Sequence, residues 1–131
     1  MATTFTIRRG VQTDLVQLVE LTKNLATETE DGLVLKDEKL MLGISKGLDD
    51  NESGSSPMYF VAESSDEKGK ILGFLAISPE WSDWWATWYW WVISVFVDSN
   101  FRRSGVGTKL FEEISLFKKR ISFIIIYIYL S

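Results

Sequence analysis

The sequence predicts a layered α/β (α+β) fold, in which helices flank one mixed β-sheet. Residues Val95 to Ile114 run from an apolar strand through a basic, glycine-bearing turn into an amphipathic helix, and a strand-like segment follows at Ile121–Leu130. Strand, helix and parallel strand form a βαβ unit, whose crossover is expected to be right-handed. Two earlier apolar segments are typical of an antiparallel hairpin, so the sheet should contain both strand orientations.

The N-terminal half predicts one strand and two helices. Phe5–Arg9 alternates apolar and polar residues, as a half-buried strand does. Thr13 is the expected N-cap of a helix that extends to Thr27. Its buried face would consist of Leu15, Leu18, Val19 and Leu25. A second helix, from about Asp37, would bury Leu40, Met41, Ile44 and Leu48. The polar segment 49–57 is expected to be a loop within the domain.

The central segments predict a meander. Met58–Glu63 and Ile71–Ile77 flank a polar turn and should pair as antiparallel strands, and Trp88–Val97 should lie beside them. Gly73 would allow a close approach of neighbouring backbone. The helix after the basic turn carries apolar residues at helical spacing, namely Val106, Leu110, Ile114 and Phe117.

The turn between that strand and helix has the layout of a phosphate cradle. Amides at a helix start lack partners and carry partial positive charge, which suits a pyrophosphate. The spacing excludes a mononucleotide P-loop, because Thr108 follows Gly107 where lysine is required. It excludes a dinucleotide fingerprint as well, because Leu110 occupies the third glycine position. What remains is Arg-x-x-Gly-x-Gly, formed by Arg102, Gly105 and Gly107.

This motif, with its strand and helix, resembles the acetyl-coenzyme A binding motif of the GNAT N-acetyltransferases. The resemblance covers about residues 5 to 117 and includes a subgroup with a tryptophan-rich connection at Glu80–Val97. It implies a GNAT-like mixed sheet and acetyl-CoA as cofactor. The backbones of Val95, Phe96 and Val97 would then pair with the pantetheine arm. The pyrophosphate would bind at Arg102, Arg103, Ser104, Gly105, Val106, Gly107 and Thr108.

The C-terminal tail departs from the family pattern. The family continues with a fifth strand, a fourth helix and two closing strands, whereas residues 118–131 do not resemble that continuation. The family's frequent general-acid tyrosine has no counterpart here. We therefore expect a truncated chain, in which Ile121–Leu130 could take the place of the fifth strand. If it finds no sheet to join, this chargeless segment would promote dimerisation or aggregation.

Length and composition bound the remaining possibilities. Residues 1–131 are expected to form one domain. With no cysteine and no histidine, a thiolate zinc site, an acyl-cysteine intermediate and a histidine base are excluded. No metal is expected. The N-terminus lacks a secretory signal and the tail is shorter than the ~20 residues of a membrane span, so a cytoplasmic protein without membrane contact is expected.

Charge is unevenly distributed along the chain. Residues 1–101 carry eight Lys and Arg against sixteen Asp and Glu, whereas residues 102–131 carry six against two. The basic excess lies where an anionic cofactor would bind, and the acidic excess where a cationic acceptor would approach. The overall net charge of −4 argues against nucleic acid binding.

Four carboxylates are candidates for the base that acetyl transfer to an amine requires. Glu80 and Asp83 are flanked by tryptophans that could desolvate them and raise their pKa toward neutrality. Glu28 and Glu30 are alternatives, because the family's first helix lines the acceptor side. The alternative for all four is that they are ordinary solvated surface acids, and a water relay could replace them.

All six tryptophans lie between Trp81 and Trp91. In the strand, Trp88 and Trp90 should point to one face, and one face should pack under helices. Trp81, Trp84 and Trp85 could form the wall of an acceptor pocket and hold a cationic amine. They could also form the interface of a homodimer.

The sequence thus predicts an N-acetyltransferase that transfers acetyl directly from acetyl-CoA to a primary amine of a small molecule or peptide. An alternative is an impaired module that binds coenzyme A or a partner without turnover. A third is a misterminated product without a function of its own.

Overall fold

The computed structural model describes residues 3–29, 34–48, 56–117 and 124–126. They form one five-stranded sheet in the order β1-β2-β3-β4-β5. The strands are β1 (Phe5–Arg9), β2 (Met58–Ser64), β3 (Ile71–Ser82), β4 (Thr87–Val97) and β5 (Ile124–Ile126). The first four strands are antiparallel to their neighbours, and β5 runs parallel to β4. The predicted mixed sheet is therefore confirmed.

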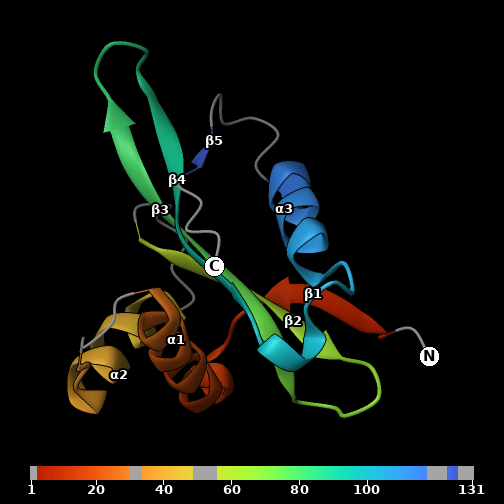
Figure 1. Cartoon of the computed structure of the whole chain (residues 1–131). Helices are drawn as coiled ribbons and strands as arrows, with labels where there is room; N and C mark the ends of the chain where they lie inside the picture. Colours follow the sequence, from red (N-terminus) through yellow and green to blue (C-terminus); the bar gives the residue numbers. More distant parts are fainter. Residues whose placement is uncertain (1–2, 30–33, 49–55, 118–123, 127–131) are drawn as a thin grey trace.

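Helices cover both faces of the sheet (Figure 1). They are α1 (Leu15–Thr29), α2 (Asp37–Lys46) and α3 (Val106–Phe117), with short 3-10 turns η1 (Gln12–Asp14) and η2 (Ser99–Phe101). Helices α1 and α2 lie on one face, where Leu18, Ile44 and Phe74 share a core. Helix α3 lies on the other face, where Leu110 and Ile114 pack with Trp90. None of the described helices combines the length and apolar character needed to cross a bilayer.

The meander forms as predicted, but its second hairpin is longer than expected. Strand β3 continues beyond Ile77 to Ser82, and its last pair with β4 is Ser82 opposite Thr87. The intervening turn, residues 83–86, ends in Ala86 with a φ of 52°. The β3–β4 hairpin consequently projects beyond the helices (Figure 1).

Two expectations for the helices are wrong. Thr13 does not cap α1: the carboxylate of Asp14 accepts a hydrogen bond of 2.8 Å from the Val11 amide, and η1 precedes α1. Met41 is not buried but 40% exposed, because α2 presents Leu40 and Ile44 to the core instead. The side chain of Phe117 and most of the segment 121–130 lie outside the described residues. Of that segment, Ile124–Ile126 forms the predicted parallel strand.

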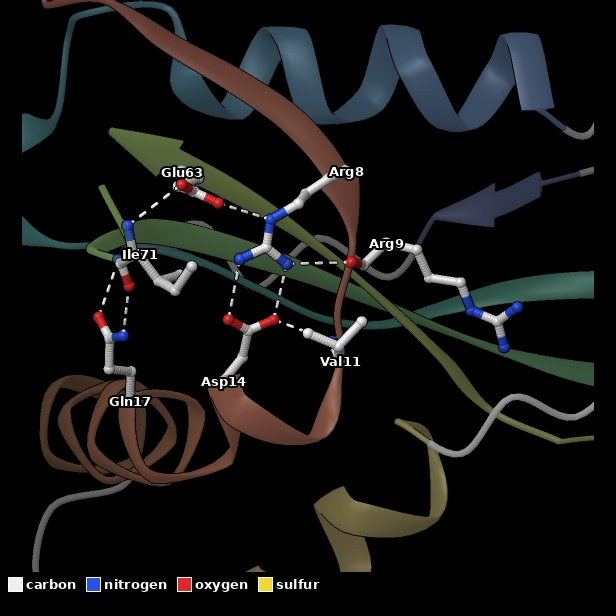
Figure 2. A network of polar contacts seen from close by, with 8 residues as sticks. Arg8, Arg9, Val11, Asp14, Gln17, Glu63 and Ile71 are labelled. Carbon is white, nitrogen blue, oxygen red and sulfur yellow. Dashed lines mark hydrogen bonds and ion pairs between the residues drawn. The ribbon is translucent and has the colours of Figure 1, made fainter. Parts of the chain in front are cut away.

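A network of hydrogen bonds and ion pairs connects the start of α1 to the sheet (Figure 2). The Arg8 guanidinium donates two hydrogen bonds to Asp14, of 2.8 and 2.9 Å, and one of 2.7 Å to Glu63 on β2. Gln17 of α1 accepts a hydrogen bond of 2.8 Å from the Ile71 amide of β3. Because Asp14 is only 2% exposed, this network replaces the water that its charge would otherwise require.

The charges of this network stabilise each other. Burial alone would raise the pKa of the Asp14 carboxyl group, but hydrogen bonds from Arg8 and the Val11 amide outweigh burial and lower it. The hydrogen bond to Arg8 likewise lowers the pKa of Glu63. Both carboxylates are therefore held in their ionised form.

Candidate functional site

The predicted cradle lies at the end of β4, where the chain turns into α3. The Asp98 amide donates a hydrogen bond of 2.8 Å to Leu72 on β3, and the Asp98 carboxylate accepts one of 2.9 Å from the Asn100 amide. The hydroxyl group of Ser104 donates to the carbonyl oxygen of Phe101 and closes the turn. Turn η2 and the loop 102–105 thus bring the chain directly from β4 to Val106, which is 1% exposed in the core.

The cradle presents a run of backbone donors. The first helical hydrogen bond of α3 joins the Lys109 amide to the Gly105 carbonyl, at 3.0 Å. Among the described residues, no acceptor is recorded for the six preceding amides, 103–108. Arg103 and Gly105 adopt left-handed conformations, with φ values of 63° and 86°. Left-handed conformations at alternate residues direct successive amides toward one side, and this arrangement suits an anion.

Space is available on the outer side of this loop. A Cβ atom added to Gly105 would meet nothing within 4 Å, and one added to Gly107 would meet only Val97, at 3.8 Å. On the inner side, Gly73 of β3 permits the close approach expected of it: its Cβ would lie 2.8 Å from the Phe96 carbonyl oxygen and 3.3 Å from Val106. The loop is therefore packed tightly against the sheet below and open above.

Arg102 holds the loop in place. Its Nε donates a hydrogen bond of 3.0 Å to the Val97 carbonyl, and its Nη2 donates one of 2.7 Å to the Glu28 carboxylate at the end of α1. The guanidinium also lies 5.1 Å from the centre of the Phe96 ring. The side chains of Arg102 and Glu28 are each 33% exposed. No partner is recorded for the exposed Arg103 guanidinium within the described ranges, so Arg103 is the cation still available to a ligand.

One edge of β4 has no described neighbour beyond the short strand β5. Strand β5 pairs only with Trp90, Trp91 and Val92. The hydrogen bond from the Asp98 amide to β3 implies, by antiparallel alternation, that the backbone groups of Val95 and Val97 point away from β3. The Val97 carbonyl accepts from Arg102, which agrees with this orientation. Val95 thus presents a donor and an acceptor at this edge.

A β-bulge in β4 was missed by the sequence analysis. Ile77 pairs with Val92 and Ala76 with Ser94, so Ile93 has no opposite residue in β3. The bulge reverses which face each side chain takes: Trp90 and Val92 pack toward α3 before it, whereas Val95 and Val97 do so after it. The segment Trp88–Val97 is apolar at every position except Ser94, so the sequence offers no alternation that could have marked the bulge.

The structure distributes the predicted cofactor residues as follows. Phe96 is buried on the α1 side of the sheet, and Val95 and Val97 pack on the α3 side, so these three offer backbone rather than side chains. Arg103, Gly105 and Thr108 are exposed at the loop surface. Gly107 and Ser104 are partly buried. All of these residues belong to one continuous β4-loop-α3 segment.

The candidate bases are not brought together. Glu28 pairs with Arg102, and Glu30 lies outside the described residues. Glu80 and Asp83 are exposed on the β3–β4 hairpin, where the structure does not provide the expected dry environment. Trp81, Trp84 and Trp85 are 52%, 86% and 72% exposed, so they do not wall a closed pocket within the described chain. Trp90 alone packs under α3, because Trp88 lies further along the projecting hairpin.

Comparison with known proteins assigns the family. Residues 21–126 match the model of the acetyltransferase (GNAT) family, so the chain belongs to this family. Its structure is similar to that of a protein described as a possible acetyltransferase from Clostridium difficile 630. The two share 30% sequence identity and a TM-score of 0.80, over 95% of this chain and 79% of that one. No match is found among curated proteins.

More distant structures share the fold. An aminoglycoside acetyltransferase from an uncultured soil metagenomic sample, in complex with sisomicin, has a TM-score of 0.69 and 22% identity, over 95% of this chain and 77% of that one. A predicted acetyltransferase with acetyl-CoA from Clostridium acetobutylicum has a TM-score of 0.74 and 15% identity, over 95% and 81% of the two chains. The family uses acetyl-CoA to acetylate an acceptor, which defines the reaction class of this chain.

Proposed function

We propose that this chain is an N-acetyltransferase that binds acetyl-CoA at the cradle and transfers the acetyl group directly to a primary amine of a small molecule or peptide. The observation that carries the proposal is the set of six amides, 103–108, without a described acceptor, beside the exposed guanidinium of Arg103. A diphosphate supplies the acceptors and the negative charge that this arrangement lacks.

The edge of β4 matches a second part of the cofactor, its pantetheine arm. The amide and carbonyl groups of Val95 face away from β3 and match the alternating donors and acceptors of a pantetheine arm. When bound, acetyl-CoA supplies an acetyl group activated as a thioester. The chain's own backbone would orient this group along β4, toward the bulge at Ile93, and hold it against an incoming amine. Transfer is direct, because the sequence contains no cysteine that could carry the acetyl group.

Proton removal from the amine is expected to run through water. A base must lie within about 3 Å of the proton that it takes, or act through one water. Glu80 is three residues beyond the Ile77–Val92 pair, which corresponds to about 10 Å along β3, and Asp83 is about 20 Å away. Glu28 already accepts a hydrogen bond from Arg102. Glu30 therefore stays a candidate for direct contact, and the other three would need a relay.

Calorimetry and a turnover assay test the proposal together. Coenzyme A is titrated into the protein, and acetyl transfer to small amines and to short peptides is followed through the released thiol. Because the chain has no cysteine, a thiol reagent reports coenzyme A alone. Binding together with amine-dependent thiol release is expected. Absence of coenzyme A binding would contradict the proposed site.

A binding module without turnover is the second candidate function. It is favoured by one observation: no described candidate base is free at the cradle, because Glu28 is paired with Arg102, and Glu80 and Asp83 lie on the projecting hairpin. Coenzyme A binding without thiol release, over a panel of amines and peptides, would identify this alternative.

A further inference from the structure

The end of the β3–β4 hairpin carries an exposed surface that the cradle does not use. This surface, the hairpin tip, consists of Glu80, Trp81, Asp83, Trp84, Trp85 and Trp88. We propose that the hairpin tip is a docking surface for a polypeptide segment that carries lysine or arginine side chains. The choice of a polypeptide over a small amine rests on the proposed function, whereas the affinity of this surface for cations does not. The projection of this hairpin away from the helices leaves it accessible (Figure 1).

The aromatic side chains of the tip are exposed, and two of them contact each other. Trp81 and Trp88 are opposite each other on β3 and β4, and their rings meet edge to face, with centroids 5.3 Å apart and planes at 71°. The Trp85 amide donates a hydrogen bond of 3.2 Å to the Ser82 hydroxyl group, which fixes the turn. Trp84 is 86% exposed. Large aromatic surfaces held in place bind a partner at low cost in conformational entropy.

Charge complementarity specifies the partner. From Ile71 to Phe101 the sequence has no lysine or arginine, and its charged residues are Glu80, Asp83 and Asp98. Both carboxylates of the tip are exposed. Asp83 precedes Trp84 in the turn, whereas Glu80 lies opposite Tyr89, on the other face of the hairpin from the Trp81–Trp88 pair. Tryptophan faces attract cations through their quadrupole. A segment with several ammonium or guanidinium groups can contact the rings and the carboxylates with different side chains. The same carboxylates would face each other across a two-fold contact between two tips, and they would repel an anionic membrane.

The length of β4 indicates a polypeptide rather than a small amine. Seven residues separate Trp88 from Val95 at the edge next to the cradle, which corresponds to about 23 Å along a strand. A small acceptor cannot contact both places, so the exposed tryptophans of the tip are too remote to line its pocket. A polypeptide of seven or more extended residues can span this length. If the proposed function holds as well, the segment at the tip would flank the amine that is acetylated.

Calorimetry with defined peptides tests the proposal. The probe is a blocked octapeptide of alternating lysine and glycine, and the controls replace each lysine by glutamine or by glutamate. We expect the lysine peptide to bind and the glutamate peptide to give no signal. The double substitution Trp84→Ala/Trp85→Ala should weaken binding about fivefold or more, since each exposed cation–π contact contributes a factor of about two to five. Glu80→Gln/Asp83→Asn should weaken it about threefold.

Matched controls lie on α2, on the opposite side of the molecule from the tip. Leu42→Ala removes a side chain that is 73% exposed, and Glu38→Gln removes an exposed charge. Neither should change peptide affinity. Equal binding of the glutamine peptide, or unchanged affinity in the tip variants, would overturn the proposal.

A second copy of the chain or a membrane surface could bind the hairpin tip instead of the peptide. Each would give a different experimental result, and either result would contradict the proposal. Self-association in light scattering that is abolished by Trp84→Ala/Trp85→Ala, without peptide binding, would identify a second copy. Preference for vesicles of anionic lipid over the lysine peptide would identify a membrane surface. Wild-type protein titrated with coenzyme A in the same buffer separates the two proposals. Peptide binding without coenzyme A binding would remove the proposed function and leave the docking surface intact.

Discussion

Arg102 and Arg103 are neighbours in the sequence but have different surroundings. Arg102 donates to the Val97 carbonyl and to Glu28, so its charge is used within the chain. Arg103 has a left-handed backbone, with φ of 63°, and its side chain is exposed. The motif arginine thus shapes the cradle, whereas its neighbour offers charge to a ligand. This distinction makes Glu28 a positioning residue in our interpretation rather than a base.

Replacing Glu28 by Gln tests this role. The substitution removes the ionic partner of Arg102, and we expect the dissociation constant of coenzyme A to rise about two- to fivefold, the range for a partly exposed ion pair. Glu28→Asp should restore part of the affinity. Glu20→Gln removes an equal charge from the same helix and should change nothing. Tighter binding by Glu28→Gln would mean that Glu28 repels the cofactor, contrary to this interpretation.

Gly105 is predicted to be more sensitive than its neighbour Gly107. Its φ of 86° disfavours any side chain, so Gly105→Val should distort the cradle and weaken coenzyme A binding about tenfold or more. Gly107→Ala should be tolerated, because its Cβ would make an ordinary contact with Val97. Gly69→Val is the matched control: its φ of 87° gives similar strain in the β2–β3 turn, so stability should fall and affinity should not.

At the scale of elements, Gly73 determines how closely β3, β4 and α3 approach. A methyl group there would meet the Phe96 carbonyl oxygen at 2.8 Å and the Val97 Cα at 3.1 Å. Gly73→Ala should lower the free energy of unfolding by about 1–3 kcal/mol, as overpacking does. Gly43→Ala, in α2 with nothing within 4 Å, should be neutral or stabilising. Equal midpoints in urea for these two variants would refute the close approach.

The contact between β1 and the start of α1 predicts that the free energy of unfolding depends on pH. Because the pKa of Asp14 is lowered on folding, its contribution is fully present above its ordinary pKa of 3.8 and is lost as the pH falls through the folded value. Asp14→Asn should cost about 1–3 kcal/mol at pH 7 and show a shallower acid limb than the wild type. Asp66→Asn, in the exposed turn, should retain the wild-type pH profile in urea unfolding.

The elements of this fold could largely be predicted from the sequence, because their signals are local. Strand β1, the start of α2 and the antiparallel hairpin follow from periodicity and turn residues. The start of α1 could not, since the Asp14 carboxylate is satisfied by Arg8, six residues earlier, and by the Val11 amide. The bulge at Ile93 and the pairing of Glu28 with Arg102 depend on tertiary contacts, which no local pattern records.

The candidate site likewise has one part that the sequence predicts and one part that depends on tertiary structure. The cradle is a contiguous segment, so its spacing in the sequence predicted its place after β4. The candidate bases are dispersed, and their environment depends on how far β3 extends. The expectation of a dry site around Glu80 and Asp83 assumed that neighbouring tryptophans fold over them, whereas the hairpin carries both outward. Proximity in sequence is a poor guide to burial at the end of a projecting hairpin.

For the whole molecule, the cradle joins parts that otherwise lie on opposite faces of the sheet. Arg102 contacts α1 through Glu28, and Val106 begins the helix on the other face. Coenzyme A at 100 times its dissociation constant should therefore stabilise the entire chain, by about 2.7 kcal/mol. The melting temperature should rise by roughly 10 °C. Calorimetric scans should show one shifted transition, and the Gly105→Val variant should show a much smaller shift.

The concentration of all six tryptophans between Trp81 and Trp91 gives the chain an internal optical reporter. Its emission spectrum arises from one hairpin: indoles at the tip emit from water, and Trp90, 2% exposed, emits from the core. A quencher such as acrylamide should remove the red component first and leave a blue residue. Loss of that blue component would report the detachment of α3 from the sheet, so no dye needs to be attached.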